Sequence, residues 1–277
     1  MRHFLRGAIC VLVCSVSLPP GSPAQKPSEP GAPAQSDGVY HAVVQLLAVG
    51  PSRKGQNQEC SATGFLVNDE GYILTNAHVV EKSHECLGKS SGAKIVARLG
   101  PITSPASSAT QSGENTAPSI SCDLVGLDDV HDLAVLKTER PLPLDGTDSS
   151  GQFARLDPTE LSTGAIVKVT GHPVFAWLAV TQSGKIVGSK SWPLFEGSAE
   201  KSDVLILDFP LKRGSSGSPV YRVTGGGVVG VVERQDSTNL SQTVAVPIQY
   251  AIDLLNRLGV RWHALDQQSP EILRIGN

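Results

Sequence analysis

Short apolar runs bounded by turn residues recur along this chain, and they limit its fold more than any other feature. The runs have the length of strands, and the 277 residues include 28 glycines and 19 prolines, which interrupt helices. Valine, which favours strands, is frequent. We therefore expect an all-β fold with strands at residues 41–49, 61–67, 72–75, 94–99, 122–127, 132–137, 166–170, 177–187, 204–209, 218–223, 228–233 and 242–246.

Two turns and one helical stripe complete this pattern. Residues 68–71 (NDEG) and 224–227 (TGGG) predict hairpin turns, because asparagine, aspartate and glycine accept turn conformations. Residues 248–258 carry apolar side chains at helical spacing and are followed by Gly259, a common helix terminator. They predict a short C-terminal helix that packs against the second half of the chain.

Three segments rich in turn-forming or small residues carry no periodic apolar pattern. Residues 25–37 predict a Pro-rich disordered linker, and residues 100–119 predict an exposed insertion. The turn-rich residues 141–157 are the expected connection between two halves of the chain. These segments divide the chain into a leader, a linker and a two-part folded region.

The first 24 residues have the features of a signal peptide. Arg2 and Arg6 precede the uncharged residues 7–18, and small residues mark a cleavage site ending at Ala24. The apolar run is short for an uncleaved anchor, and no small residue precedes Cys14 to favour lipidation. We expect export to the bacterial periplasm or the extracellular space, with no stable membrane span after cleavage.

Export would leave three cysteines, Cys60, Cys86 and Cys122, in an oxidising compartment. Two of them can pair there, and one is left over. Cys60 and Cys86 bracket His78, whereas Cys86 and Cys122 bracket the 100–119 insertion. Either disulfide is therefore possible.

Three segments carry the residue types of nucleophilic catalysis. His78 lies in TNAHVV after a strand-like run, Asp132 opens the apolar run DLAVL, and Ser216 lies in RGSSGSP. Taken one at a time, His78 is explained as a hydrogen-bonded polar residue, Asp132 as a turn or strand cap, and Ser216 as part of a Ser/Gly-rich loop. Together, they offer a serine hydroxyl, an imidazole to accept its proton and a carboxylate to orient the imidazole. The amides of Gly214 and Ser216 would then form an oxyanion hole.

These motifs, in this order, resemble the protease domain of the HtrA/Deg branch of the trypsin-like serine proteases. That family has TN-x-HVV, DLAVL and RGNSGGP where this chain has TNAHVV, DLAVL and RGSSGSP. The resemblance implies a chymotrypsin-like double six-stranded β-barrel and a serine endopeptidase with His78, Asp132 and Ser216 as its catalytic triad. The implied protease domain spans residues 38–259, with barrels at about 38–140 and 158–247, a helix at 248–258 and a tail at 260–277.

The chain departs from the family in its nucleophile loop and in its length. Ser215 and Ser218 stand where the family commonly has asparagine and glycine, and no PDZ domain is expected after the last helix. The SGSP motif also occurs in glutamyl endopeptidases. Residues 231–233, however, lack the histidine that those enzymes use to hold a glutamate side chain, so glutamate specificity is not expected.

The resemblance also implies a position for the specificity pocket. Its floor is expected at Pro210, with Gly230, Val231 and Ala245 on the strands that form its walls. No aspartate lies at the expected floor to hold an arginine or lysine side chain. A small or medium aliphatic residue before the cleaved bond is therefore the preferred interpretation.

Other functional classes fit the sequence less well. An α/β-hydrolase would need a glycine at Ser218 and the order Ser, Asp, His. No metal or organic cofactor is expected, because His78, His84 and His131 lack the spacing of a metal site, and His84 and His131 are expected at the surface. The strongest alternative is a trypsin-fold binding or scaffold protein without turnover.

Partners are expected to be polypeptide substrates. A formal net charge of −3 gives no reason to expect nucleic acid or an anionic membrane surface. The sequence leaves the oligomeric state open.

Overall fold

The computed structural model describes residues 38–49, 60–86, 94–98, 119–140, 153–173, 178–193 and 201–265. The expected signal peptide and linker lie outside the described residues, as do nearly all of the 100–119 insertion and most of the 141–157 connection. Within the described ranges, no helix is both long enough and apolar enough to cross a lipid bilayer.

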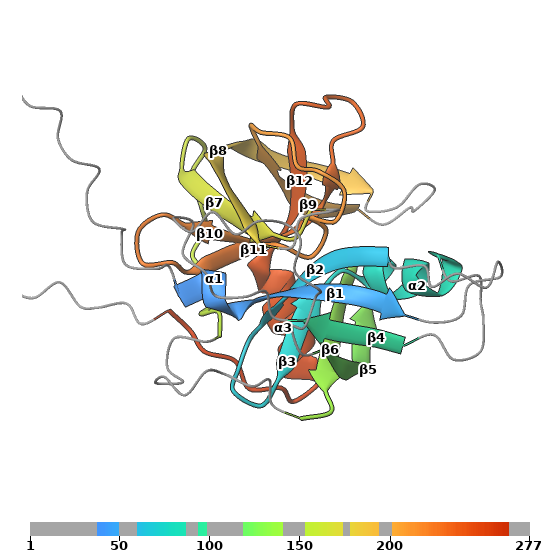
Figure 1. The fold of residues 1–277 in the computed structure, drawn as a ribbon. Helices are drawn as coiled ribbons and strands as arrows, with labels where there is room; N and C mark the ends of the chain where they lie inside the picture. Colours follow the sequence, from blue (N-terminus) through green and yellow to red (C-terminus); the bar gives the residue numbers. More distant parts are fainter. Residues whose placement is uncertain are drawn as a thin grey trace, which may run out of the picture. The chain divides into compact units, whose positions relative to one another are not determined.

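The first six strands close into an antiparallel barrel in the order β1-β2-β3-β6-β5-β4 (Figure 1). The short helix α1 (Gly38–Ala42) precedes this barrel and occupies the start of the expected first strand. The strands are β1 (Val43–Val49), β2 (Cys60–Leu66), β3 (Tyr72–Thr75), β4 (Lys94–Arg98), β5 (Ser119–Asp128) and β6 (Leu133–Thr138).

The remaining six strands close into a second antiparallel barrel in the order β10-β11-β12-β9-β8-β7. The two closed barrels confirm the expected chymotrypsin-like architecture. The strands are β7 (Ile166–Gly171), β8 (Val180–Pro193), β9 (Lys201–Leu207), β10 (Pro219–Arg222), β11 (Val228–Gln235) and β12 (Thr243–Pro247).

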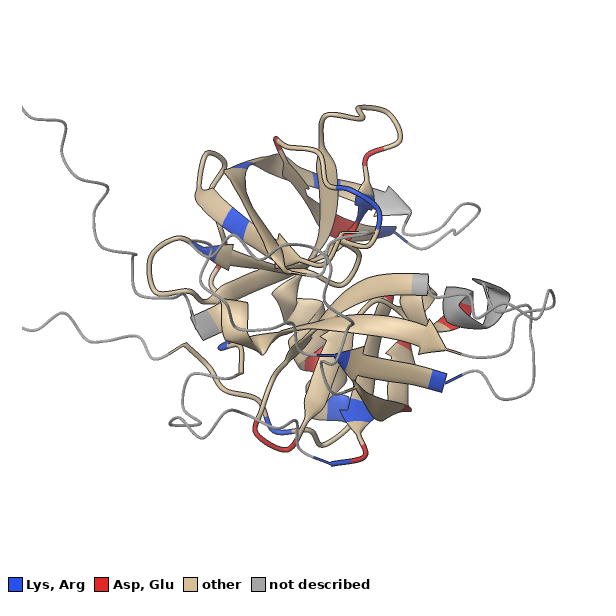
Figure 2. Ribbon diagram, viewed as in Figure 1, with Lys and Arg blue, Asp and Glu red and all other residues tan. Residues whose placement is uncertain are grey.

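Alternation of side chains along a strand explains how these sequences fill the barrels. In β9, Val204 and Ile206 belong to the large buried cluster that also contains residues of the first barrel and α3, whereas Leu205 between them packs against the smaller cluster formed by strands of the second barrel. Figure 2 shows most charged residues in loops and near strand ends. Each fully buried valine or isoleucine contributes about 1.5–3 kcal/mol relative to an exposed one.

The C-terminal helix α3 (Ile248–Arg257) confirms the expected helical stripe. Its buried side chains are Ile248, Ala251, Ile252, Leu254 and Leu255. The helix contacts β11 and β12 of the second barrel, as expected, and also β5 and β6 of the first barrel. Helix α3 is thus shared by both barrels.

Cys122 in β5 is buried and free. The structure therefore contradicts the Cys86–Cys122 pairing, one of the two disulfides that the sequence allows. Burial raises the pKa of the Cys122 thiol to about 12, with nearby Asp123 and Glu139 acting in the same direction. The side chains of Cys60 and Cys86 lie outside the described part of the chain, so a bridge between them stays a prediction.

Candidate active site

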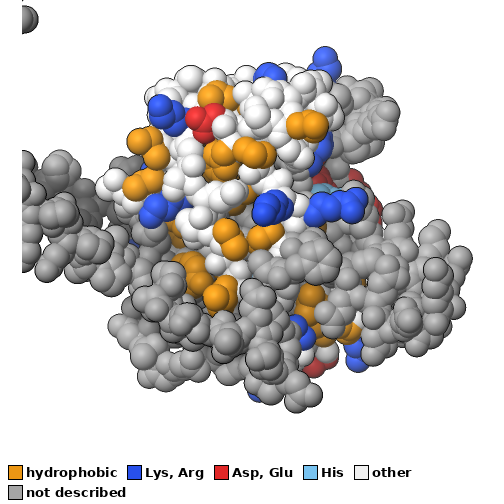
Figure 3. All heavy atoms as spheres, turned by 45° about the horizontal axis from the view of Figure 1, so that its top comes forward, with side chains coloured by type: hydrophobic (Ala, Val, Ile, Leu, Met, Phe, Trp, Pro, Cys, Tyr) orange, Lys and Arg blue, Asp and Glu red, His pale blue; other side chains and the backbone are white. Residues whose placement is uncertain are grey.

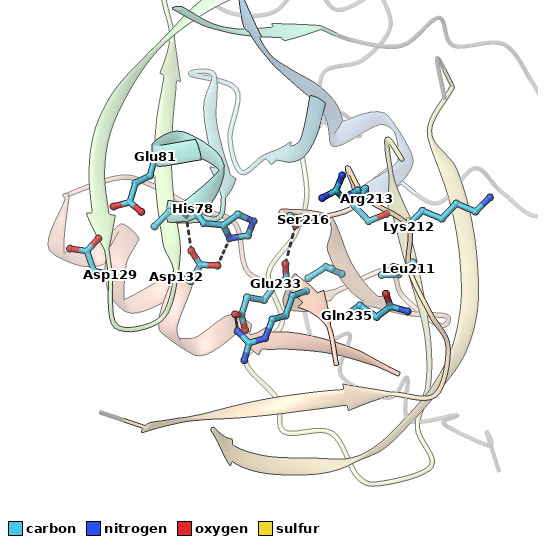
Figure 4. A pocket seen from close by; sticks show the side chains of 14 residues that line it. His78, Glu81, Asp129, Asp132, Leu211, Lys212, Arg213, Ser216, Glu233 and Gln235 are labelled. Carbon is cyan, nitrogen blue, oxygen red and sulfur yellow. Dashed lines mark hydrogen bonds and ion pairs between the residues drawn. The ribbon is translucent and has the colours of Figure 1, made fainter. Parts of the chain in front are cut away.

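His78, Asp132 and Ser216 line one pocket with a volume of about 710 Å³ (Figure 4). His78 lies in the first turn of α2 (Ala77–Cys86), a helix that the sequence did not predict. Asp132 ends the turn between β5 and β6, and Ser216 lies in the loop between β9 and β10. Residues from both barrels therefore converge at this pocket.

Two hydrogen bonds join His78 to Asp132. The ring nitrogen Nδ1 lies 2.6 Å from Oδ2 of Asp132, and the backbone N–H of His78 donates to Oδ1 at 2.8 Å. A carboxylate only accepts hydrogen bonds, so Nδ1 carries the proton in this pair, and in the neutral imidazole the lone pair is then on Nε2. In Figure 4 the imidazole ring lies between the carboxylate of Asp132 and Ser216.

The backbone of Asp132 adopts an unusual conformation. Its φ of +51° is the one positive value for a non-glycine residue in the described part of the chain. Such a conformation costs about 1–3 kcal/mol and persists only where surrounding contacts hold it. One of those contacts is from the fully buried Asn76, whose side-chain Nδ2 donates to the carbonyl of Asp132 at 3.0 Å.

Two glycines and one threonine shape the loop that carries Ser216. Gly214 and Gly217 have φ values of +91° and +83°, which an L side chain rarely adopts. Thr63 of β2 donates twice to this loop, from its hydroxyl to the carbonyl of Gly214 at 2.8 Å and from its amide to the carbonyl of Ser216 at 3.0 Å. A strand of the first barrel thus holds the nucleophile loop of the second.

The two amides expected to form an oxyanion hole are available. The N–H groups of Gly214 and Ser216 donate to no acceptor among the described residues, whereas that of Gly217 donates to the carbonyl of Val232 at 2.9 Å. The amide of Ser215 closes a turn on the carbonyl of Lys212 at 3.1 Å. With a positive φ at Gly214 only, this turn has the pattern of type II.

The hydroxyl of Ser216 does not donate to His78 in this structure. It donates to the carbonyl oxygen of Glu233 in β11 at 3.0 Å (Figure 4). The imidazole and the hydroxyl therefore share a pocket without being joined by a hydrogen bond.

A charged pair in β11, Glu233 and Arg234, was not predicted from the sequence. The side chain of Glu233 is 3% exposed, pairs through Oε1 with Arg234, and has no partner for Oε2 among the described residues. Burial lowers the pKa of Arg234, while the charges of Asp132 and Asp236 act in the opposite direction. Both Glu233 and Arg234 line the pocket, and a β-bulge between Val232 and Arg234 places them there.

The rest of the pocket wall is charged on both sides. Glu81 and Asp129 lie on the side of the first barrel, and Lys212 and Arg213 lie on the side of the second (Figure 4). The space-filling view shows lysine and arginine side chains beside an exposed histidine (Figure 3). A substrate at this site meets both signs of charge. No cluster of side chains that could hold a metal ion is present among the described residues.

The residues predicted for the specificity pocket do not line this pocket. Val231 and Ala245 are completely buried in the barrel core, Gly230 lies within β11, and Pro210 is exposed. Neighbouring positions, Leu211 and Val232, line it instead. The floor at Pro210 and the aliphatic specificity inferred from it therefore stay predictions.

Comparison with known proteins places this architecture in a family. Residues 62–231 match the family model of the trypsin-like peptidase domain. The chain is 29% identical over 214 residues to a probable periplasmic serine endoprotease DegP-like of Hahella chejuensis, covering 75% of this chain and 38% of the relative. A DegP-like relative of Halomonas elongata is 25% identical over 217 residues, covering 75% and 37%. The chain thus spans less than two-fifths of the length of these relatives.

Solved structures share the fold. The active form of the Rv3671c protease from M. tuberculosis matches with a TM-score of 0.59 and 17% identity, covering 82% of this chain and 84% of that one. The HtrA-type protease AlgW with a bound tripeptide matches with a TM-score of 0.55 and 19% identity, covering 79% and 60%. With two closed barrels and a family model that matches well over half of its length, this chain belongs to the trypsin-like peptidase family.

Proposed function

We propose that this chain is a serine endopeptidase that hydrolyses peptide bonds in polypeptide substrates. The observation that carries the proposal is the His78–Asp132 pair, held by two hydrogen bonds, in the same pocket as Ser216. A paired imidazole beside a serine hydroxyl is the arrangement needed for nucleophilic catalysis.

In the proposed reaction, the hydroxyl of Ser216 rotates away from the carbonyl of Glu233 towards Nε2 of His78. Nε2 accepts the hydroxyl proton while Oγ attacks the scissile carbonyl, and His78 then protonates the leaving amine. Water, activated by the same nitrogen, releases the acyl group. Asp132 keeps the imidazole in the required tautomer and stabilises the imidazolium that forms.

The developing oxyanion is assigned to the amides of Gly214 and Ser216. Their lack of acceptors among the described residues supports this role. A donor of this kind is typically worth about 10²–10³-fold in kcat. Because Thr63 fixes two carbonyls of the same loop, the amides are held in place before substrate binds.

The edge of β11 supports a polypeptide as the substrate. Pairing with β10 ends at Val231, whereas pairing with β12 continues to Gln235. Among the described residues, Arg234 and Gln235 therefore have a strand partner on one side only, and Glu233 is the bulged residue before them. All three line the pocket. An extended peptide can add to such an edge by backbone hydrogen bonds.

A second function, a binding protein without turnover, is favoured by one observation. The hydroxyl of Ser216 is bound to the carbonyl of Glu233 and not to the base. If this bond persists with substrate bound, no nucleophile forms.

A fluorophosphonate probe separates the two functions, because it reacts only with an activated serine. We expect wild type to be labelled, Ser216→Ala to be unlabelled, and Ser241→Ala, a change at an exposed turn serine, to be labelled like wild type. Absence of labelling in folded wild type, with and without a peptide substrate, would favour the binding protein.

We further propose that the protein is exported. The Arg2–Arg6 start and the apolar residues 7–18 support this, and the relatives named above are called periplasmic. Fractionation of cells that express the full chain should recover a form shortened near Ala24 outside the cytoplasm. A variant with Arg2 and Arg6 retained but residues 7–18 deleted should stay inside.

A further inference from the structure

We propose that helix α3 positions the Asp132 carboxylate through four side chains, Asp128, His131, Tyr250 and Arg257, which we name the α3 clasp. The inference rests on the proposed serine endopeptidase function and extends it. None of the four residues lines the pocket, so they act as positioning residues and not as catalytic ones.

The centre of the α3 clasp is the carboxylate of Asp128, which is 9% exposed at the end of β5. One oxygen accepts the backbone N–H of His131 at 3.1 Å and lies 3.0 Å from its Nδ1. The other oxygen accepts from Arg257 of α3 at 2.7 Å. Burial raises the pKa of Asp128, but the hydrogen bonds from His131 and Arg257 and the charge of His131 outweigh burial and leave the pKa below its usual value.

A ring contact makes a second connection to the helix. The imidazole of His131 stacks on Tyr250 of α3, with ring centroids 3.8 Å apart and planes inclined by 18°. His131 is therefore held at its edge by Asp128 and on its face by Tyr250. The sequence led us to expect His131 at the surface, and its side chain is 21% exposed.

The α3 clasp adjoins the strained backbone of Asp132. His131 directly precedes Asp132, whose φ of +51° needs external restraint. Asn76 supplies restraint from the side of His78, through its bond to the carbonyl of Asp132. The α3 clasp supplies it from the opposite side, by fixing the residue on the N-terminal side of the strained peptide.

The helix is a firm support for this purpose. Its apolar stripe is buried between the barrels. The Leu258 side chain that follows it lies so close to Gly126 of β5 that a Cβ at Gly126 would come within 2.6 Å. Movement of α3 relative to the first barrel is therefore transmitted to residues 128–132, and from there to the partner of His78.

The test compares Arg257→Met and Tyr250→Leu with a matched control on the same helix, Gln249→Met, which removes an exposed bond to Asp253. We expect kcat to fall roughly 10- to 100-fold in the two clasp variants with KM within about two-fold, because small displacements of an aligned group have effects of this size. Arg257→Lys should recover part of kcat, and Gln249→Met should match wild type.

A second measurement does not depend on turnover. The Nδ1 proton of His78, held by the carboxylate of Asp132 at 2.6 Å, should give a low-field NMR signal in wild type that disappears in His78→Ala. We expect this signal to broaden or vanish in Arg257→Met and Tyr250→Leu, at temperatures well below the unfolding midpoint of each variant. An unchanged signal in both variants overturns the inference, even if wild type proves inactive. Wild type that keeps the signal but is never labelled by the probe overturns the proposed function alone.

Discussion

The hydroxyl of Ser216 donates to the carbonyl oxygen of Glu233, although the imidazole of His78 lines the same pocket. A rotation about one side-chain bond takes the hydroxyl to another staggered position. A peptide that pairs with the edge of β11 would compete for the same carbonyl. Substrate binding and activation of the serine would then be linked.

Substitution of the three proposed triad residues should separate their roles. Ser216→Ala and His78→Ala are expected to lower kcat by several orders of magnitude, and Asp132→Asn by roughly 10⁴-fold, as found for equivalent groups in other proteases. Initial rates on an unstructured protein substrate measure these effects. Asp129→Asn is the matched control, because Asp129 lines the pocket without bonding to His78. Full activity in Asp132→Asn together with a loss in Asp129→Asn would assign the orienting role to Asp129.

A methyl group at Gly217 should disrupt the nucleophile loop. Its φ is +83°, and a Cβ there would lie 2.0 Å from the carbonyl oxygen of Thr63. Strain of about 1–3 kcal/mol is expected from the backbone alone, and the collision adds to it. Gly217→Ala should therefore lower the unfolding midpoint and abolish probe labelling. Gly188→Ala, where a Cβ meets nothing within 4 Å, should change neither, and equal behaviour of the two variants would contradict the account.

The contribution of Asp157 to stability should depend on pH. Burial raises the pKa of Asp157, but hydrogen bonds from Thr159 and Arg222 and the charge of Arg222 outweigh burial, so the pKa is lowered in the folded state. A lowered folded pKa gives stability that is present above the unfolded value of about 3.9 and lost as the pH falls through the folded value. Urea unfolding should give Asp157→Asn a lower free energy of unfolding than wild type at pH 7. This difference in free energy should become smaller below about pH 4. If the difference in free energy of unfolding were the same at both pH values, the stabilisation could not come from the lowered pKa of Asp157.

Cys122 should resist alkylation in the native protein. Its thiol is buried, and burial raises its pKa to about 12, so the reactive thiolate is scarce. We expect iodoacetamide to modify Cys122 only after denaturation, as read by mass spectrometry of the peptide that contains it. Recovery of Cys122 in a disulfide under oxidising, native conditions would contradict the structure.

The sequence was sufficient for the parts of the site that local patterns encode. The strand-like runs predicted an all-β fold, and the resemblance of three short motifs to HtrA/Deg proteases implied the two barrels. The same motifs suggested His78, Asp132 and Ser216 as the triad, which we propose above. The alternation of apolar residues in strands and the residue preferences of turns are local properties, so they predict the observed strands closely. Small differences remain, such as helix α1 at residues 41–42, where a strand was predicted.

The residues that the sequence missed depend on register and on distant contacts. The bulge between Val232 and Arg234 breaks the alternation along β11, and both Glu233 and Arg234 line the pocket, which a regular strand pattern does not predict. The bond between Asp128 and Arg257 joins positions 129 residues apart. No pattern within a single segment reports such a pair.

Thr63 has a consequence for any attempt to divide the protein. Its strand belongs to one barrel, yet the carbonyls it fixes belong to the segment that carries the reactive hydroxyl of the other. The first barrel produced by itself would lack Ser216, and the second barrel by itself would lack the two hydrogen bonds from Thr63 that hold the nucleophile loop. Two separately expressed halves should therefore show probe labelling of Ser216 only when they are mixed and associate. Labelling would then indicate that the hydrogen bonds of Thr63 to the nucleophile loop have formed again.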